Sequence, residues 1–149
     1  MAMLTIANVQ EYQSDILEYG LAEFDDFFAK TETDIQRRLE IDWWQRRNHS
    51  IHDITIRSGD NAVMDTTKLK ESQFTRAAVY HCLAFYILPR LTTWTPERDR
   101  FREMIDWYTD KWEQEFDLIL KQGVYYDEDG DSVYESDERT SYHHGRLVR

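Results

Sequence analysis

Three long segments of this chain repeat apolar residues at every third or fourth position, and this periodicity constrains the fold more than any other feature. Such a repeat places the apolar side chains on one face of an α-helix, which packs that face against its neighbours. We therefore expect helices in residues 21–47, 72–91 and 95–122. The repeating residues are Phe24, Phe28, Ile35, Leu39 and Trp43 in the first segment, Phe74, Ala77, Ala78, His81, Phe85 and Leu88 in the second, and Phe101, Ile105, Tyr108, Trp112, Phe116 and Ile119 in the third.

Other residues indicate where the first helices begin and end. Thr5 is a suitable N-cap for a short helix over residues 5–12, and Gly20 predicts a break before the next element. Pro89 lacks a backbone N–H group, so it should stop or kink the second long helix.

The third long helix has the clearest predicted boundaries. Thr95 can accept a backbone N–H group as N-cap, and Pro96 fits the first helical position. Gly123 predicts the end of this helix, because glycine commonly follows the last helical turn.

Residues 48–65 lose the helical period. Ile54 and Ile56 alternate with polar residues, and a Ser-Gly-Asp-Asn turn signal follows at residues 58–61. This pattern predicts a projecting loop or hairpin.

The pattern changes again after the third helix. An Asp-Gly turn signal within residues 128–131 separates two tyrosine-bearing stretches, residues 124–127 and 132–135, which predicts a β-hairpin. The fold class is therefore expected to be all-α: a small bundle of three main helices plus a short N-terminal helix, with a projecting loop, a C-terminal β-hairpin and an extended arm. Residues 1–122 would form the helical bundle domain, and residues 123–149 would form the hairpin and docking arm.

Composition limits the classes of partner. The chain has 149 residues, of which 41% are hydrophobic, enough for the core of one compact domain. Its formal net charge is -11, so direct DNA or RNA binding is disfavoured. No apolar stretch approaches the roughly 18 residues needed to cross a bilayer, and residues 1–10 lack the pattern of a signal segment. We therefore expect a soluble protein without membrane contact.

His81 lies on the apolar face of the second long helix, and Cys82 lies in the apolar run beside it. A single cysteine forms no internal disulfide, which suits a reducing compartment, and no His-Asp partner pattern points at Cys82. We interpret Cys82 as a small buried apolar residue and His81 as a hydrogen-bonded core or interface residue.

The remaining histidines lie outside the predicted helices. His49 and His52 with Asp53, or His143 with His144, could serve as zinc ligands or an acid-base pair, but they lack the helical spacing and cysteine partners of a strong zinc motif. We interpret them as surface residues. No Gly-rich phosphate loop, nucleophile elbow or paired-carboxylate motif is present, so we expect neither enzymatic activity nor a cofactor.

Acidic residues alternate along the predicted C-terminal turn. Asp127, Asp129, Asp131 and Glu138 occupy positions 1, 3, 5 and 12 of a calcium-binding EF-hand loop, but Ser132 stands where that loop requires glycine. A solvated hairpin tip is the preferred interpretation, with a calcium site as the alternative.

The tryptophans divide into two groups. Trp43 and Trp112 lie on the apolar faces and should belong to the core, whereas Trp44 and Trp107 lie beside those faces. A tryptophan in that position can cover either a core edge or a subunit interface.

Three stretches together resemble the adaptor proteins of tailed bacteriophages, the head-to-tail connector or neck subunits that form a ring beneath the portal. They are DIQRRLEIDWW at residues 34–44, FTRAAVYHCLAFYILPRL at residues 74–91, and GVYYDEDGD from residue 123 continuing to the final RLVR. The first resembles the helix with an aromatic end of these proteins, the second their Arg-Ala-bearing helix, and the third their exit from the last helix into an acidic hairpin and arm. Residues 1–20 and 48–65 match nothing in this family.

The resemblance implies a structural virion protein that is assembled in the bacterial host cytoplasm. Usually twelve copies of such a protein form a ring at the head-tail junction. The partners would be the portal protein, neighbouring copies, and the next neck or tail protein, a stopper or tail terminator. DNA would pass through the ring without specific binding. The C-terminal arm would dock onto the portal through Tyr142, His143, His144, Arg146, Leu147, Val148 and Arg149.

The net negative charge also has a role in this interpretation. A channel wall that repels phosphates lets DNA slide, because the counterion release that makes basic proteins bind DNA is absent. We expect part of the surplus acid to face the channel. The candidate residues are Asp53, Asp60, Asp127, Glu128, Asp129 and Asp131.

Two other classes compete with this interpretation. An acidic DNA mimic would occupy the site of a nucleic-acid-binding protein, but the 18 Lys and Arg residues give this chain mixed rather than uniformly acidic helices. A metal-dependent hydrolase built on a helical bundle would require inward Glu and Glu-x-x-His pairs, which the sequence lacks.

Overall fold

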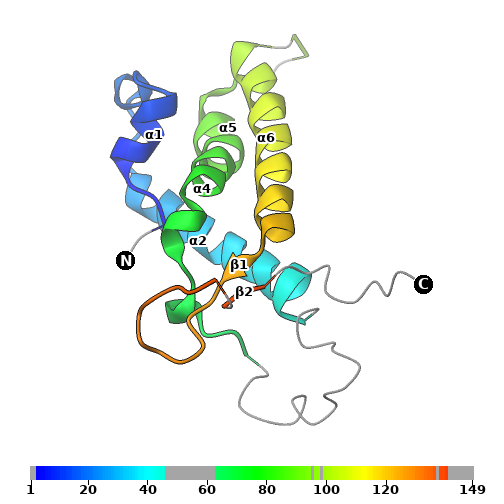
Figure 1. The fold of residues 1–149 in the computed structure, drawn as a ribbon. Coiled ribbons are helices and arrows are strands. Elements are labelled where there is room, and N and C mark those ends of the chain that lie inside the picture. Colours follow the sequence, from blue (N-terminus) through cyan, green and yellow to red (C-terminus); the bar gives the residue numbers. More distant parts are fainter. Residues whose placement is uncertain (1–2, 46–62, 95, 98, 137, 141–149) are drawn as a thin grey trace, which may run out of the picture.

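The protein is mostly helical, as the sequence predicts. The computed structural model describes residues 3–45, 63–94, 96–97, 99–136 and 138–140. Its main helices are α1 (Ile6–Tyr12), α2 (Phe24–Leu39), α4 (Thr75–Cys82), α5 (Leu88–Leu91) and α6 (Arg100–Gln122). Figure 1 shows a small two-stranded sheet, β1 (Val124–Tyr125) and β2 (Arg139–Thr140), at the lower end of α6.

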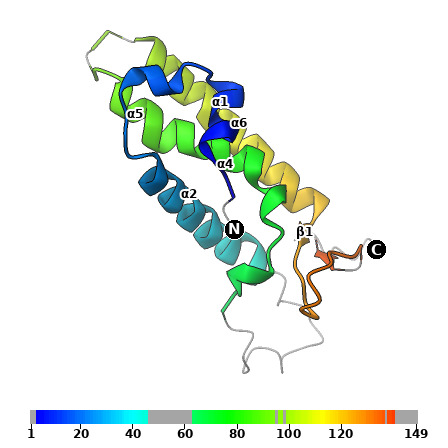
Figure 2. The ribbon, with the colours of Figure 1, turned by 90° about the vertical axis from the view of Figure 1, so that its left-hand side faces the viewer.

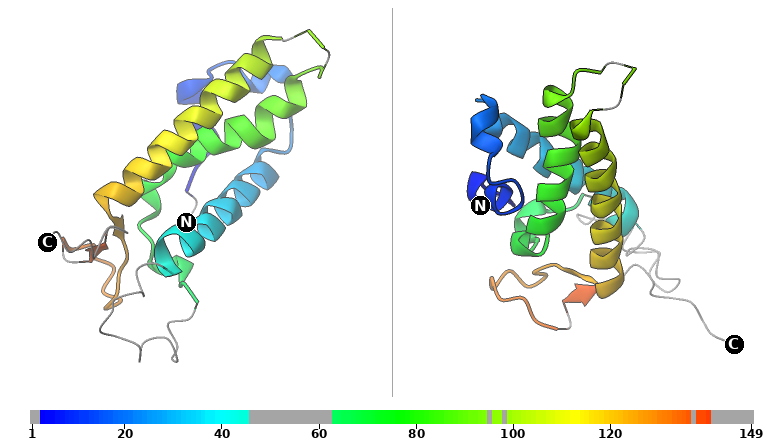
Figure 3. Two further views of the ribbon diagram at one scale, coloured as in Figure 1. Left: turned by 90° about the vertical axis from the view of Figure 1, so that its right-hand side faces the viewer. Right: turned by 90° about the horizontal axis from the view of Figure 1, so that it is seen from above.

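The helices pack around one apolar core. The segment formed by α4 and α5 lies between α6 on one side and α2 on the other (Figures 2 and 3). The predicted core residues of α2 and α6, among them Trp43 at the end of the α2 segment and Trp112, are buried with exposed fractions of 0% and 2%. Burial of such large apolar surfaces is the main stabilising contribution in a domain of this size.

The N-terminal region follows its sequence signals. Thr5 precedes α1 in an extended conformation, and its N–H group donates to Asn8 Oδ1 at 2.8 Å. Gly20 ends a short 3-10 turn at φ 75°, in the left-handed region that glycine adopts without strain. The break predicted at Gly20 is therefore confirmed.

The segment after α2 differs from a regular helix. A π-helical turn, Glu40–Trp44, continues α2 and buries both Trp43 and Trp44, the latter 5% exposed. The open question about Trp44 is thus settled in favour of the core. The predicted loop or hairpin at residues 48–65 lies almost wholly outside the described residues.

The second long helix corrects one prediction. The expected core residue Phe85 is 46% exposed, whereas Ala84 and Ile87 are buried. A π-helical turn at Leu83–Ile87 widens the helix there, so a strict period of 3.6 no longer gives the inward face. Pro89 lies in the first turn of α5, where its missing N–H group costs little.

The start of α6 also differs from its predicted position. Helix α6 begins at Arg100, and Asp99 rather than Thr95 is its N-cap. The Asp99 carboxylate accepts from Arg102 N–H at 2.9 Å and from Thr92 Oγ1 at 2.9 Å, so it satisfies the helix end and holds the preceding loop together. Gly123 ends α6 as predicted.

After α6, the strands β1 and β2 form a small sheet. Val124 pairs with Thr140 and Tyr125 with Arg139, in an antiparallel register. The expected partner stretch, residues 132–135, is not a strand in this structure. A compact acidic loop instead occupies residues 126–138, and the predicted arm beyond Thr140 lies outside the described residues.

Candidate functional site

The C-terminal segment is fixed to the end of the bundle. Gln73, just before α4, donates from Nε2 to the Gly123 carbonyl at 2.8 Å and accepts from Tyr125 N–H at 3.1 Å. Val124 is fully buried, and Tyr126 packs its ring 5.1 Å from that of Trp44. The chain therefore leaves α6 in a direction set by the bundle itself.

Backbone hydrogen bonds extend this attachment. Lys70 N–H donates to the Tyr125 carbonyl at 3.3 Å, and Asp127 N–H donates to the Lys68 carbonyl at 2.9 Å. An isolated bridge also joins Leu69 to Tyr126. The part of the C-terminal segment up to Thr140 thus packs on the helices, and the division into domains at residue 122 stays a prediction.

The acidic loop is organised by Asp127. This residue is 6% exposed, and its two carboxylate oxygens accept from Gly130 N–H at 2.6 Å and Ser132 N–H at 2.9 Å. Burial acts to raise the pKa of Asp127, but these N–H donors outweigh it, and the pKa is lowered. Asp127 is therefore an ionised structural centre of the loop.

Glu138 closes the same loop from its other end. Its carboxylate accepts from Glu128 N–H at 2.9 Å and from Glu135 N–H at 3.1 Å. Asp129 and Asp131 accept from the N–H groups two residues further on, a local arrangement typical of aspartate in turns. The alternating acids of the sequence thus bind the N–H groups of their own loop.

The same carboxylates could also meet a cation. Asp127, Asp129 and Asp131 each offer an oxygen, and these oxygens lie within 4.8 Å of one another. Ca²⁺ takes six to eight oxygen ligands at about 2.3–2.6 Å, often from carboxylates. The exposed Asp129 and Asp131 agree with the solvated tip preferred from the sequence, whereas Asp127 is buried.

A polar junction connects α2 to α6. Arg38 donates from both terminal nitrogens to Glu113, at 2.6 and 2.7 Å, and from Nε to Asp42 at 3.1 Å. Its guanidinium lies over the rings of Trp112 and Phe116. This bidentate, stacked geometry is one that lysine would not reproduce.

His81 lies beside this junction and is 7% exposed. Its Nε2 is 3.8 Å from Asp34 Oδ2, and its Nδ1 is buried without a hydrogen-bond partner. Burial lowers the pKa of His81 to about 4, against an opposing effect of Asp34. His81 is therefore a neutral core residue at pH 7, but it lacks the hydrogen bond expected of it.

Cys82 is also a core residue. It is fully buried, and burial raises the pKa of its thiol to about 12. A thiol with such a pKa is not ionised at neutral pH and is a poor nucleophile. The predicted structural role of Cys82 is thus the one its surroundings support.

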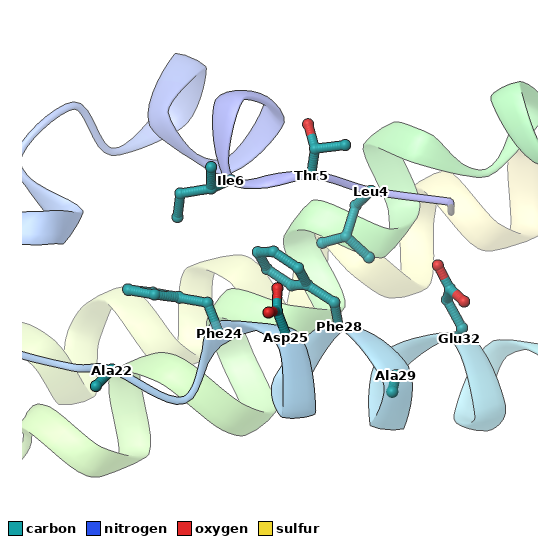
Figure 4. A pocket seen from close by; sticks show the side chains of 9 residues that line it. All are labelled: Leu4, Thr5, Ile6, Ala22, Phe24, Asp25, Phe28, Ala29 and Glu32. Atoms are coloured by element: carbon teal, nitrogen blue, oxygen red, sulfur yellow. The ribbon is translucent and has the colours of Figure 1, made fainter. Parts of the chain in front are cut away.

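An open groove of about 610 Å³ lies between the N-terminal segment and the start of α2 (Figure 4). Leu4 and Ile6 extend into it from one side, and Phe24 and Phe28 from the other. Glu32 at its edge accepts from Met3 N–H at 2.7 Å, so this contact holds the chain start against α2.

One exposed face of α6 carries large apolar side chains. Trp107 and Leu118 are 51% and 45% exposed, and they are eleven residues apart, which is close to three helical turns. Lys111 places its Nζ 5.3 Å from the Trp107 ring centre. Trp107 therefore belongs to the surface, and the interface role considered for it remains open.

The structure places only some of the predicted site residues. Glu128, Asp129 and Asp131 are exposed at one end of the molecule. The channel acids Asp53 and Asp60 and the loop histidines lie outside the described residues. So do all docking-arm residues: Tyr142, His143, His144, Arg146, Leu147, Val148 and Arg149.

Sequence reasoning missed Gln73 and Arg38, which join segments far apart in the chain. Gln73 carried no pattern beyond its place before an apolar helix face. Arg38 did carry a signal, since Arg38 and Asp42 have the spacing of an ion pair on a helix. No sequence rule indicates Glu113 as the third member, because it lies 75 residues away.

Comparison of the chain with protein-family models, curated proteins and solved structures finds no significant match. Among the described residues, no helix combines the length and the apolar character required to cross a bilayer.

Proposed function

We propose that this protein is an adaptor subunit of a tailed-bacteriophage neck, which forms a ring on the portal and continues the DNA channel toward the tail. The proposal rests on the resemblance of three stretches of the sequence to such adaptors. It also rests on the attachment of the segment that follows α6 to the end of the bundle.

The attachment of the C-terminal segment is the observation that supports this proposal most. Gln73, Val124 and Tyr126 fix the segment, so that the last described residue, Thr140, belongs to a strand at one end of the bundle. The predicted docking arm follows Thr140. A docking arm starting from a rigid point searches a small volume, which lowers the entropic cost of binding.

The composition of the final residues fits a docking role. Leu147 and Val148 would supply apolar contacts with the portal, while Arg146 and Arg149 would pair with acidic portal groups. Each arm alone would bind weakly. A ring of copies multiplies such a contact through effective concentration.

The exposed helix surfaces fit assembly. Trp107 and Leu118 are exposed apolar residues on a helix whose inner face is already packed, and aromatic residues are enriched in protein interfaces. The described ion pairs, such as Lys30 with Asp26 and Arg90 with Glu23, mix both signs of charge on the surface. A mixed surface suits contact with other proteins better than imitation of a phosphate backbone.

The direct test is to mix the purified chain with the portal protein of the same virus and to measure the mass of the complex. We expect a complex with many copies of the chain per portal, arranged as a ring in electron micrographs. A chain that forms no complex with the portal, but displaces DNA from a basic protein, would instead support the DNA-mimic alternative.

A further inference from the structure

A small cleft below the end of α6 carries two cations. Its volume is about 310 Å³, and it opens beside β1 and β2. Lys70 and Arg139 provide the positive charge, and Ser72 adds a hydroxyl group. The remaining lining residues are Gln73, Gln122 and Tyr125.

Several cations in the described part of the chain are paired with a carboxylate, but these two are not. Lys30, Arg38, Arg90 and Lys121 each reach a carboxylate within 3.1 Å. Lys70 and Arg139 have no such partner among the described residues. Two unpaired cations that line one cleft attract acidic groups.

Tyr125 holds the two cations in place. Lys70 Nζ lies 4.8 Å from the centre of the Tyr125 ring, and the Arg139 guanidinium lies 5.3 Å from it. Tyr134 adds a second ring, 5.7 Å from Lys70 Nζ. Because these contacts restrict long side chains before any ligand arrives, the entropic cost of binding a carboxylate is reduced.

We propose that this cleft binds carboxylates, and that its occupant is the acidic tip, residues 128–131, of a second copy of this chain. This contact would join neighbouring copies in the ring. Its place in a ring rests on the proposed function. A tip on one copy would meet the cleft of the next. Such a head-to-tail contact repeats in one direction and generates a ring when the rotation closes.

The arrangement of tip and cleft supports a neighbouring copy as the occupant. The chemistry is complementary, since the tip exposes Glu128, Asp129 and Asp131 to solvent. Figure 1 shows the loop between β1 and β2 extending to one side, away from the strands beneath α6. The base of the loop is fixed there, because Lys68 donates from Nζ to the Glu128 carbonyl at 3.2 Å.

The same tip was a candidate for the channel wall. Carboxylates paired with a neighbour's cations do not face passing DNA, so one tip cannot serve both roles at once. The cleft could also receive an acidic segment of another protein. A proximity experiment between two copies separates these alternatives.

The test uses two single-cysteine variants of the full chain. Ser72→Cys marks the cleft and Ser132→Cys marks the tip; both positions are exposed, and the native Cys82 is buried. The two variants are mixed at high protein concentration and low salt, with a chelator present, and treated with a short maleimide crosslinker. We expect at least tenfold more crosslinked heterodimer than from Ser72→Cys mixed with Ser14→Cys, an exposed control position.

Charge variants show whether the tip acids carry the contact. Asp129→Asn with Asp131→Asn in the tip-marked chain keeps the side-chain oxygens that accept loop N–H groups. We expect these tip substitutions to reduce the yield of crosslinked heterodimer to the control level. The same reduction is expected from Lys70→Gln with Arg139→Gln in the cleft-marked chain, and from 0.5 M salt. A yield equal to the Ser14→Cys control, or a yield that the charge variants leave unchanged, would overturn the proposal.

The outcome is independent of the portal. Crosslinking without a ring on the portal would contradict the proposed function and leave the contact between copies standing. A ring on the portal without tip-to-cleft crosslinking would support the proposed function and overturn the contact between copies.

Discussion

The helical bundle and the C-terminal segment are stabilised by different kinds of contact. In the bundle, many large apolar side chains such as Trp43 and Phe116 fill the core. In residues 123–140, Val124 and Tyr126 are the apolar anchors, while Gln73, Asp127 and Glu138 direct the backbone through hydrogen bonds. The segment therefore depends on a few identifiable groups, whereas the bundle depends on the sum of many.

This difference predicts a large global effect for a core substitution. Trp43→Ala removes a fully buried side chain and should lower the free energy of unfolding by about 3–5 kcal/mol, because it leaves a cavity. Trp107→Ala is the matched control, since Trp107 is 51% exposed, and it should change stability by about 0.5 kcal/mol. Urea unfolding followed by circular dichroism measures both. Equal losses for the two variants would mean that Trp43 is not part of a close-packed core.

The bundle should also lose stability in acid because of His81. Its pKa is about 4 in the folded protein and 6.5 in the unfolded chain, so between these values only the unfolded chain binds the proton. Stability should fall as the pH drops from 6.5 toward 4, by up to about 3 kcal/mol, with no further loss from His81 below pH 4. Asp34 and Glu113 raise this pKa and Arg38 lowers it, and all three face the imidazole.

The measurement is urea unfolding at pH 7 and at pH 4.5 for the wild type and for His81→Leu. The variant should lose less stability between the two pH values, because it cannot take up the proton. If both proteins lose the same amount, other groups cause the acid sensitivity.

A smaller and local effect is expected for the clamp between the two regions. Gln73→Ala removes the hydrogen bonds to Gly123 and Tyr125, which should weaken the attachment by about 1–3 kcal/mol. Amide hydrogen exchange at residues 124–127 should become faster, while exchange in the middle of α6 should hardly change. Ser72→Ala is the control, because Ser72 is adjacent and exposed. Unchanged exchange at residues 124–127 would show that apolar contacts alone hold the segment.

The same contrast explains what the sequence could predict. Periodicity finds residues that share one helix face, so Trp43, Trp112 and Phe116 were assigned to the core correctly. It fails where the helix changes its own geometry, as at Leu83–Ile87, where the π-helical turn turns Phe85 outward. Local capping rules found Thr5 and Gly123 but chose Thr95 over Asp99, because the bonds from Asp99 to Thr92 and Thr93 form only once the loop is folded.

The C-terminal segment was harder to predict for a related reason. The Asp-Gly signal at residues 129–130 lies in the loop between β1 and β2. Asp127 and Glu138 bend the backbone by accepting hydrogen bonds from N–H groups five and ten residues away, which no two-residue turn rule includes. The alternating acids were the available signal, since Asp127, Asp129 and Asp131 each accept from N–H groups of their own loop.

The most direct test of the account compares the full chain with a chain ending at Thr140, which retains β2 and its pairing with Val124. Both proteins are mixed with the portal, and the fraction bound is measured by sedimentation, with circular dichroism as the check on folding. We predict that the shortened chain keeps its helical content but loses portal attachment. Equal attachment of the two proteins would contradict the docking role of residues 141–149.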